Sequence, residues 1–189
     1  MIRTIFRKNA RIFSGYTPQP LRIAGVVKDS VVDGPGHRFT VFVQGCPHKC
    51  EGCHNKQAQS FNGGTMADVY KIAEKIIKSR MEKVTFSGGE PFMQPAGLAR
   101  VARLVRDFKE IEIITYTGYL LEEILEFADY DPTIKDLLAE TNYLVDGKFE
   151  QNKKSLDCFY RGSSNQRIFD VTGYPNTKKA RLIEKREDF

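Results

Sequence analysis

Short apolar runs and longer amphipathic stretches alternate along most of the chain. The run at residues 38–44 is almost unbroken, with Phe39, Val41, Phe42 and Val43, as expected of a strand covered on both faces. Similar runs predict further strands at residues 21–27, 83–86, 111–116, 143–145, 167–171 and 180–183, the last two at the edges of a sheet.

Four stretches repeat their apolar positions with the period of an α-helix. The first helix is predicted to begin with a capping box at Thr65-Met66-Ala67-Asp68, and Pro95 is expected as the first residue of the second. Asp131-Pro132 begins the fourth. The residues expected to face inward are Val69, Ile72, Ala73, Ile76 and Ile77; Leu98, Val101, Ala102, Val105 and Phe108; Leu121, Ile124, Leu125 and Ala128; and Ile134, Leu137 and Leu138.

The spacing of these elements predicts a parallel sheet. About 30 residues separate the ends of successive central strands, which is the length of a strand-helix-strand unit. Polar or glycine-rich segments follow four of the strands, so they meet at the carboxyl edge, where α/β folds bind ligands. Because 189 residues fall short of the ~250 of a closed eight-unit barrel, we expect an α/β fold forming an incomplete TIM-like barrel, open on one side.

Composition is that of an ordinary soluble domain. Hydrophobic residues make up 41% and charged residues 28% of the chain, and no apolar run approaches the ~20 residues of a membrane helix. Charge interrupts the first residues too early for a signal peptide. We therefore expect a cytoplasmic protein with a basic leader and linker at residues 1–20, one domain at 21–183 and a frayed tail at 184–189.

The positive charge is concentrated at the start of the chain. Residues 1–28 hold six basic side chains and no acidic one, whereas the remainder holds 23 bases and 24 acids. No basic stripe with interleaved aromatic residues accompanies the globular part, so neither nucleic acid nor a membrane is an expected partner. The leader is interpreted as a solvated tail, with a transit peptide or an arm for an acidic partner as alternatives.

Three of the four cysteines, Cys46, Cys50 and Cys53, lie on one predicted loop with the spacing C-x3-C-x2-C. Thiolates this close together can ligate an iron-sulfur cluster, and three ligands leave one iron of a cubane free. A zinc site with His48 or His54 as fourth ligand, covalent haem attachment at the C-x-x-C-H sequence and chemically idle thiols are the alternatives. The absence of an export signal disfavours haem.

Short motifs accompany the cysteine loop on both sides. They are Asp33-Gly34-Pro35-Gly36-His37-Arg38, Gly45-Cys46, Cys53-His54-Asn55, Gly88-Gly89-Glu90-Pro91, Thr115-Tyr116-Thr117-Gly118, Asp146-Gly147 and the run from Arg161 to Arg167. Together they resemble the radical S-adenosylmethionine enzymes, and among them the family that activates anaerobic ribonucleoside-triphosphate reductase, over residues 21–171. Many radical enzymes carry an aromatic residue before the third cysteine, whereas Gly52 stands here, as is usual in the activase family.

The resemblance implies a [4Fe-4S] cluster on Cys46, Cys50 and Cys53, with S-adenosylmethionine chelated by the open iron. Gly88, Gly89 and Glu90 are then expected to bind that cofactor, Glu90 through the opposite charge of its carboxylate, and Thr117 and Asp146 to contact the rest of it. Reductive cleavage would yield methionine and a 5′-deoxyadenosyl radical, which takes hydrogen from a glycine of the reductase. A low-potential donor such as flavodoxin or ferredoxin would supply the electron, under anaerobic conditions.

Two other functions remain as alternatives. One is a small-molecule radical enzyme resembling 7-carboxy-7-deazaguanine synthase, and the other is a non-catalytic zinc-stapled interaction module. Cys158 is expected to be an inert thiol, because a fourth ligand would block the cofactor. The histidines at 37, 48 and 54 are interpreted as solvated loop residues or proton carriers, and Arg161 and Arg167 either bind an acidic partner or brace their own loop.

Overall fold

The computed structural model describes residues 17–174 and 180–186. Most of the predicted leader, residues 1–16, and the end of the predicted tail, residues 187–189, lie outside these described residues. None of the described helices combines the length and the apolar composition needed to cross a lipid bilayer.

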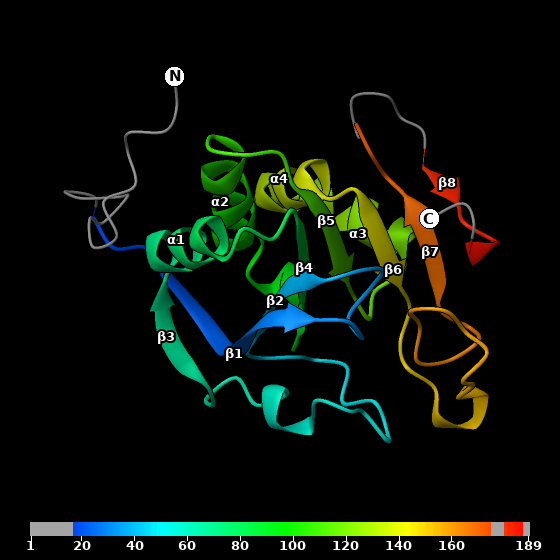
Figure 1. The fold of residues 1–189 in the computed structure, drawn as a ribbon. Coiled ribbons are helices and arrows are strands. Elements are labelled where there is room, and N and C mark those ends of the chain that lie inside the picture. The colour runs from blue at the N-terminus through cyan, green and yellow to red at the C-terminus, as the bar shows by residue number, and fades with distance from the viewer. Residues whose placement is uncertain (1–16, 175–179, 187–189) are drawn as a thin grey trace.

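One mixed sheet organises the described part of the chain (Figure 1). Its strands follow the order β3-β1-β2-β4-β5-β6-β7-β8. They are β1 (Pro20–Ser30), β2 (Arg38–Val43), β3 (Thr65–Asp68), β4 (Lys83–Gly88), β5 (Glu112–Tyr116), β6 (Tyr143–Asp146), β7 (Arg167–Asp170) and β8 (Arg181–Leu182). Strands β2, β4, β5 and β6 are parallel, and antiparallel strands flank them on both sides. The sheet is not closed, because β3 and β8 stand at its two edges.

Four α-helices of the described residues cover one face of the sheet (Figure 1). They are α1 (Val69–Ser79), α2 (Pro95–Arg106), α3 (Leu121–Ala128) and α4 (Pro132–Glu140). The main core lies between this layer and the sheet, and it contains most of the predicted inward residues, including Ile72, Leu98 and Leu137. Pro95 begins α2 as predicted, since its missing N–H costs nothing in the first turn.

The opposite face of the sheet carries a smaller apolar cluster and a buried arginine. Ile114, Val145, Ile168 and Ile183 pack together there. Arg38 is fully buried at the start of β2, where its guanidinium donates to Thr85 Oγ1 at 2.7 Å and to a carboxylate oxygen of Glu112 at 2.8 Å. The buried charge is therefore compensated by hydrogen bonds and an ion pair.

Three sequence predictions were wrong in detail. Residues 65–68 form strand β3, and α1 begins only after Asp68, whose side chain accepts a hydrogen bond from Tyr70 N at 3.2 Å. Phe108 lies beyond the end of α2 and is 45% exposed. Strand β7 is not an edge strand, because β6 and β8 pair with its two sides.

The position of the cap gives a direct test of the first correction. Replacing Asp68 by Ala should lower the free energy of unfolding by about 1 kcal/mol, because the Asp68 carboxylate accepts from the backbone N–H groups of both Tyr70 and Gln19. Replacing the exposed Thr65 by Ala, at the position that the sequence suggested as the cap, should change the free energy of unfolding by less than about 0.5 kcal/mol. Urea denaturation of both variants measures the difference, and equal losses would contradict the assignment.

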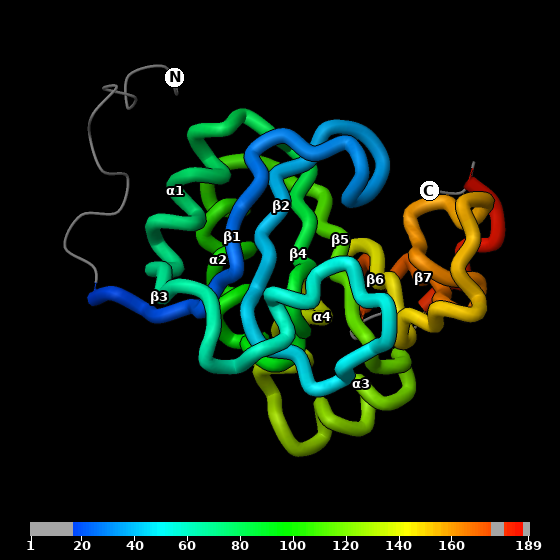
Figure 2. The backbone as a smooth tube through the Cα atoms, turned by 90° about the horizontal axis from the view of Figure 1, so that it is seen from below, coloured from blue at the N-terminus to red at the C-terminus, as the bar shows by residue number. Residues whose placement is uncertain are grey.

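The carboxyl edge of the parallel strands carries the loops that bear the chemistry. Figure 2 looks at this edge from below, with the cysteine loop after β2 in the foreground and the segment after β6 beside it. A parallel sheet gathers the ends of its strands at one edge, so residues far apart in sequence become neighbours there.

Candidate functional site

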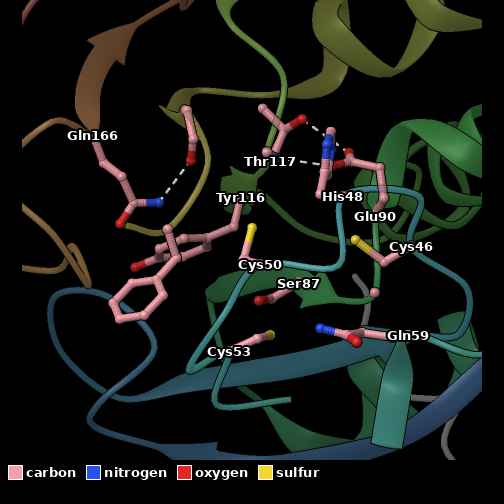
Figure 3. A pocket seen from close by; sticks show the side chains of 15 residues that line it. Cys46, His48, Cys50, Cys53, Gln59, Ser87, Glu90, Tyr116, Thr117 and Gln166 are labelled. Atoms are coloured by element: carbon pink, nitrogen blue, oxygen red, sulfur yellow. Dashed lines mark hydrogen bonds and ion pairs between the residues drawn. The ribbon is translucent and has the colours of Figure 1, made fainter. Parts of the chain in front are cut away.

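The three clustered cysteines line one pocket at this edge (Figure 3). All three are free thiols, and they come from a single loop. The remaining walls come from the ends of β4 and β5 and from the segment after β6. Together with the cysteine loop after β2, they follow four parallel strands that are neighbours in the sheet. The lining residues are Cys46, His48, Cys50, Cys53, Gln59, Ser87, Gly88, Gly89, Glu90, Tyr116, Thr117, Gly118, Gly147, Phe149 and Gln166. Cys158 is not among them.

The backbone of the cysteine loop is closed on itself by hydrogen bonds. Gly45 N donates to Ala58 O at 2.8 Å, and Cys46 N donates to Gln59 O at 3.0 Å. The buried amide of Gln44 reaches across the loop and donates to Ser60 O at 2.6 Å. Backbone groups and the amide of Gln44 therefore close the start of the loop.

Two glycines let the turn after β4 approach the end of β2. Gly89 N donates to Val43 O at 2.7 Å. A Cβ on Gly88 would lie 2.6 Å from Val43 N, and one on Gly89 would lie 2.3 Å from Gly45 O. No side chain fits at either position, and Gly88 also has a φ of +102°, which favours glycine. The sequence predicted close approach to a cofactor here; the structure shows close approach to the neighbouring backbone, on the wall of the pocket.

Glu90 is the most highly connected side chain of the pocket. It is 1% exposed. Its Oε1 accepts from Phe92 N at 3.0 Å and from Thr117 Oγ1 at 2.9 Å. Its Oε2 accepts from Gly118 N at 2.8 Å and lies 3.0 Å from His48 Nε2. The carboxylate thus joins the cysteine loop to the ends of β4 and β5, and direct contact with a cofactor stays a prediction.

His48 is a site residue whose importance sequence reasoning missed. It was interpreted as a solvated loop residue or a proton carrier, yet its side chain is only 5% exposed. Its ring packs against Tyr119 with centroids 4.4 Å apart, and a Cβ on Gly118 would lie 2.3 Å from its Cδ2. The other two histidines are exposed. The glycine after Thr117 was the available signal, because it leaves room for a ring from another loop.

Thr117 and Asp146, the other two predicted cofactor contacts, are placed differently. Thr117 lines the pocket and donates to Glu90. Asp146 is fully buried outside the lining, where it accepts from Leu121 N at 2.7 Å and pairs with the guanidinium of Arg167. The structure brings Thr117 to the cysteines and gives Asp146 a role at the start of α3.

The polar run from Arg161 to Arg167 braces the segment after β6. Arg161 donates to Gln166 O at 2.9 Å, which is the bracing role considered for it in the sequence, and Arg167 pairs with Asp146 and Glu122. The side chain of Gln166 accepts from Gly162 N and donates to Gly147 O. The run thereby holds Gly147 and Phe149 against the pocket.

The three thiols can ligate one centre. Their sulfurs stand around a shared space, as Figure 3 shows for Cys46, Cys50 and Cys53. Burial raises the pKa of Cys46 and of Cys50, so loading with a metal centre would displace protons. Three thiolates suit an iron-sulfur cluster, whereas His48, a candidate fourth ligand of a Cys3His zinc site, pairs with Glu90 instead.

Comparison with known proteins gives a consistent result. The family described as a 4Fe-4S single cluster domain matches residues 32–169, which include the whole site. The anaerobic ribonucleoside-triphosphate reductase-activating protein of Pasteurella multocida (strain Pm70) is 35% identical over 153 residues, covering 76% of this chain and 94% of that protein. The proteins of the same name from Enterobacteria phage T4 and Escherichia coli (strain K12) are 34% and 37% identical, over 75% and 72% of this chain and 88% and 90% of their own lengths.

These matches agree with the geometry, because the matched region carries the three thiols and every strand end that lines their pocket. The chain belongs to the 4Fe-4S single cluster domain family, in the group of anaerobic ribonucleoside-triphosphate reductase-activating proteins.

Proposed function

We propose that this protein is a radical S-adenosylmethionine enzyme that generates a glycyl radical on an anaerobic ribonucleoside-triphosphate reductase. One observation carries the proposal: three free thiols from one loop face a pocket whose other walls include the Gly88-Gly89-Glu90 turn and the end of β5. A [4Fe-4S] cluster on Cys46, Cys50 and Cys53 would supply the electron, and S-adenosylmethionine would supply the 5′-deoxyadenosyl group that takes hydrogen from the reductase glycine.

The chain's own residues hold and orient these groups. The loop backbone fixes the thiols, and the backbone of Gly88 and Gly89 forms the adjacent wall. Glu90 ties that wall to Thr117 and Gly118 through hydrogen bonds of 2.8–2.9 Å. Because these donors and acceptors have protein partners, the hydrogen bonds hold the ends of β4 and β5 beside the cysteine loop.

The shape of the sheet supports a macromolecular substrate. We interpret the fold as the incomplete TIM-like barrel of radical S-adenosylmethionine enzymes, in which four parallel strands form part of a barrel and antiparallel strands end it on both sides. A sheet that stays open leaves one side of the site accessible to a loop of another protein. We place this reaction in the anaerobic cytoplasm, with flavodoxin or ferredoxin as the proposed donor.

The test is anaerobic reconstitution followed by reaction with the reductase. The reconstituted protein should contain iron and acid-labile sulfide in equal amounts and, once reduced, convert S-adenosylmethionine to methionine and 5′-deoxyadenosine. Electron paramagnetic resonance should then detect a glycyl radical on the reductase. A protein that binds one zinc ion and no sulfide would support the interaction module instead. Cofactor cleavage without a radical on the reductase would support the small-molecule enzyme.

A further inference from the structure

The position before the third cysteine is filled by side chains from a different part of the chain. Gly52 has a φ of +70°, and a Cβ there would lie 2.0 Å from Oε1 of Gln151 and 3.4 Å from Cε1 of Phe149. A side chain at residue 52 would displace the amide of Gln151 and would be strained by this φ, whereas the ring of Phe149 stands at ordinary contact distance. The ring of Phe149 therefore lies beside residue 52, where many radical enzymes carry an aromatic residue of their own.

Phe149 is held in this place from several directions. Its ring centroid lies 5.7 Å from that of His54. On another side the backbone of Gly162 approaches so closely that a Cβ there would lie 2.8 Å from Cδ2 of Phe149. Gly162 is itself fixed, because its N–H donates to the side chain of Gln166. The ring is therefore packed between the cysteine loop and the run that contains Gly162, and it still lines the pocket beside Cys50 and Cys53.

The pocket needs an apolar surface for one part of its ligand. S-adenosylmethionine combines a charged amino-acid portion with a flat purine, and purines stack on aromatic side chains whatever their sequence context. The walls made by Glu90, Thr117 and Gly118 are polar, whereas Phe149 presents an aromatic ring with no polar atom to satisfy. The polar and aromatic walls thus match the two chemically different ends of the molecule.

We infer that Phe149, which lines the pocket beside Cys50 and Cys53, binds the adenine ring of S-adenosylmethionine. This inference rests on the proposed function and specifies one contact within it. It also explains the run from Arg161 to Arg167, whose hydrogen bonds fix the segment that carries the ring.

The experiment measures binding by the reconstituted holoprotein with isothermal titration calorimetry. Phe149→Ala should weaken the binding of S-adenosylmethionine and of 5′-deoxyadenosine by about fivefold to a hundredfold, the range expected for loss of one base stack. Methionine, which has no purine, should bind equally well to the variant and to the wild type. Phe149→Tyr should restore nucleoside binding and Phe149→Leu should not, although both keep the space filled.

Controls separate this contact from general damage. Iron and sulfide contents should match the wild type in all three variants, and Phe108→Ala, which removes a ring 45% exposed beyond α2, should leave binding unchanged. Equal binding of 5′-deoxyadenosine by the wild type and Phe149→Leu would overturn the inference alone. So would a parallel loss of methionine binding, since that would indicate a structural role. A wild-type holoprotein that binds neither S-adenosylmethionine nor 5′-deoxyadenosine would overturn the proposed function and the inference together.

Discussion

Replacing Cys46, Cys50 or Cys53 by Ala is expected to remove the bound iron and sulfide and to abolish cleavage of S-adenosylmethionine. Each thiol faces the same pocket, and two remaining ligands on one loop cannot hold a cluster that otherwise has three. Removing a residue that only hydrogen-bonds to a metal ligand typically lowers activity about 10-fold to 100-fold. Removing a ligand itself should cost more, so we expect cleavage activity to fall by more than about 100-fold. Iron and sulfide assays on anaerobically reconstituted protein, together with quantification of 5′-deoxyadenosine, measure both effects.

The fourth cysteine provides the matched control. Cys158 is a free thiol on the segment after β6, outside the lining of the pocket, so Cys158→Ala should retain full iron, sulfide and cleavage activity. Two results would contradict the ligand assignment: loss of the cluster in this variant, or a full complement of iron in one of the other three.

Replacing Glu90 by Ala is expected to lower the free energy of unfolding of the metal-free protein by about 3 kcal/mol, because it leaves several buried donors without an acceptor. The carboxylate is 1% exposed and accepts from Phe92 N, Thr117 Oγ1 and Gly118 N. Glu90→Gln should cost less, about 1–2 kcal/mol, since the amide keeps one acceptor oxygen but turns an NH₂ group toward an N–H donor. Urea denaturation under reducing conditions measures both losses.

Cofactor cleavage should fall in the same order, with Glu90→Ala below Glu90→Gln. The exposed Glu51, which lies on the cysteine loop itself, supplies the control. Glu51→Ala should change stability by less than about 0.5 kcal/mol, because exposed charges contribute little. If both glutamate positions gave the same small effect, Glu90 would not be the link between the strand ends.

Local patterns of apolar residues predicted most of the helices and strands. The main error, a helix start predicted at residues 65–68, arose because strand pairing with a distant part of the chain overrides the local pattern. The helices were found because each buries one face with the period of an α-helix. Residues 65–68 looked like a helix start because Thr65 and Asp68 are both capping residues. They form β3 because they pair with β1, where Pro20 faces Asp68, and no local pattern reveals such a pairing.

The parts of the site that lie on one short segment, such as the cysteine loop, could be predicted from the sequence. The spacing of the three cysteines predicted their convergence, and the parallel sheet predicted that the turn at Gly88 and the end of β5 would lie beside them. The contact between His48 and Glu90 was not predicted, because 42 residues separate them and no local pattern pairs the two positions. Phe149 was missed for the same reason: its partner at Gly52 is visible only once the loops are packed.

The hydrogen bonds that close the cysteine loop bear on how the protein matures. Ala58, Gln59 and Ser60 tie back the start of the loop, and Glu90 N donates to Gly45 O at 2.8 Å. None of these bonds involves a sulfur atom, so all of them can remain when a cysteine is replaced. A variant that lacks one of the three thiols should therefore lose its inorganic centre without losing the closed start of the loop, which separates maturation of the centre from folding of the chain.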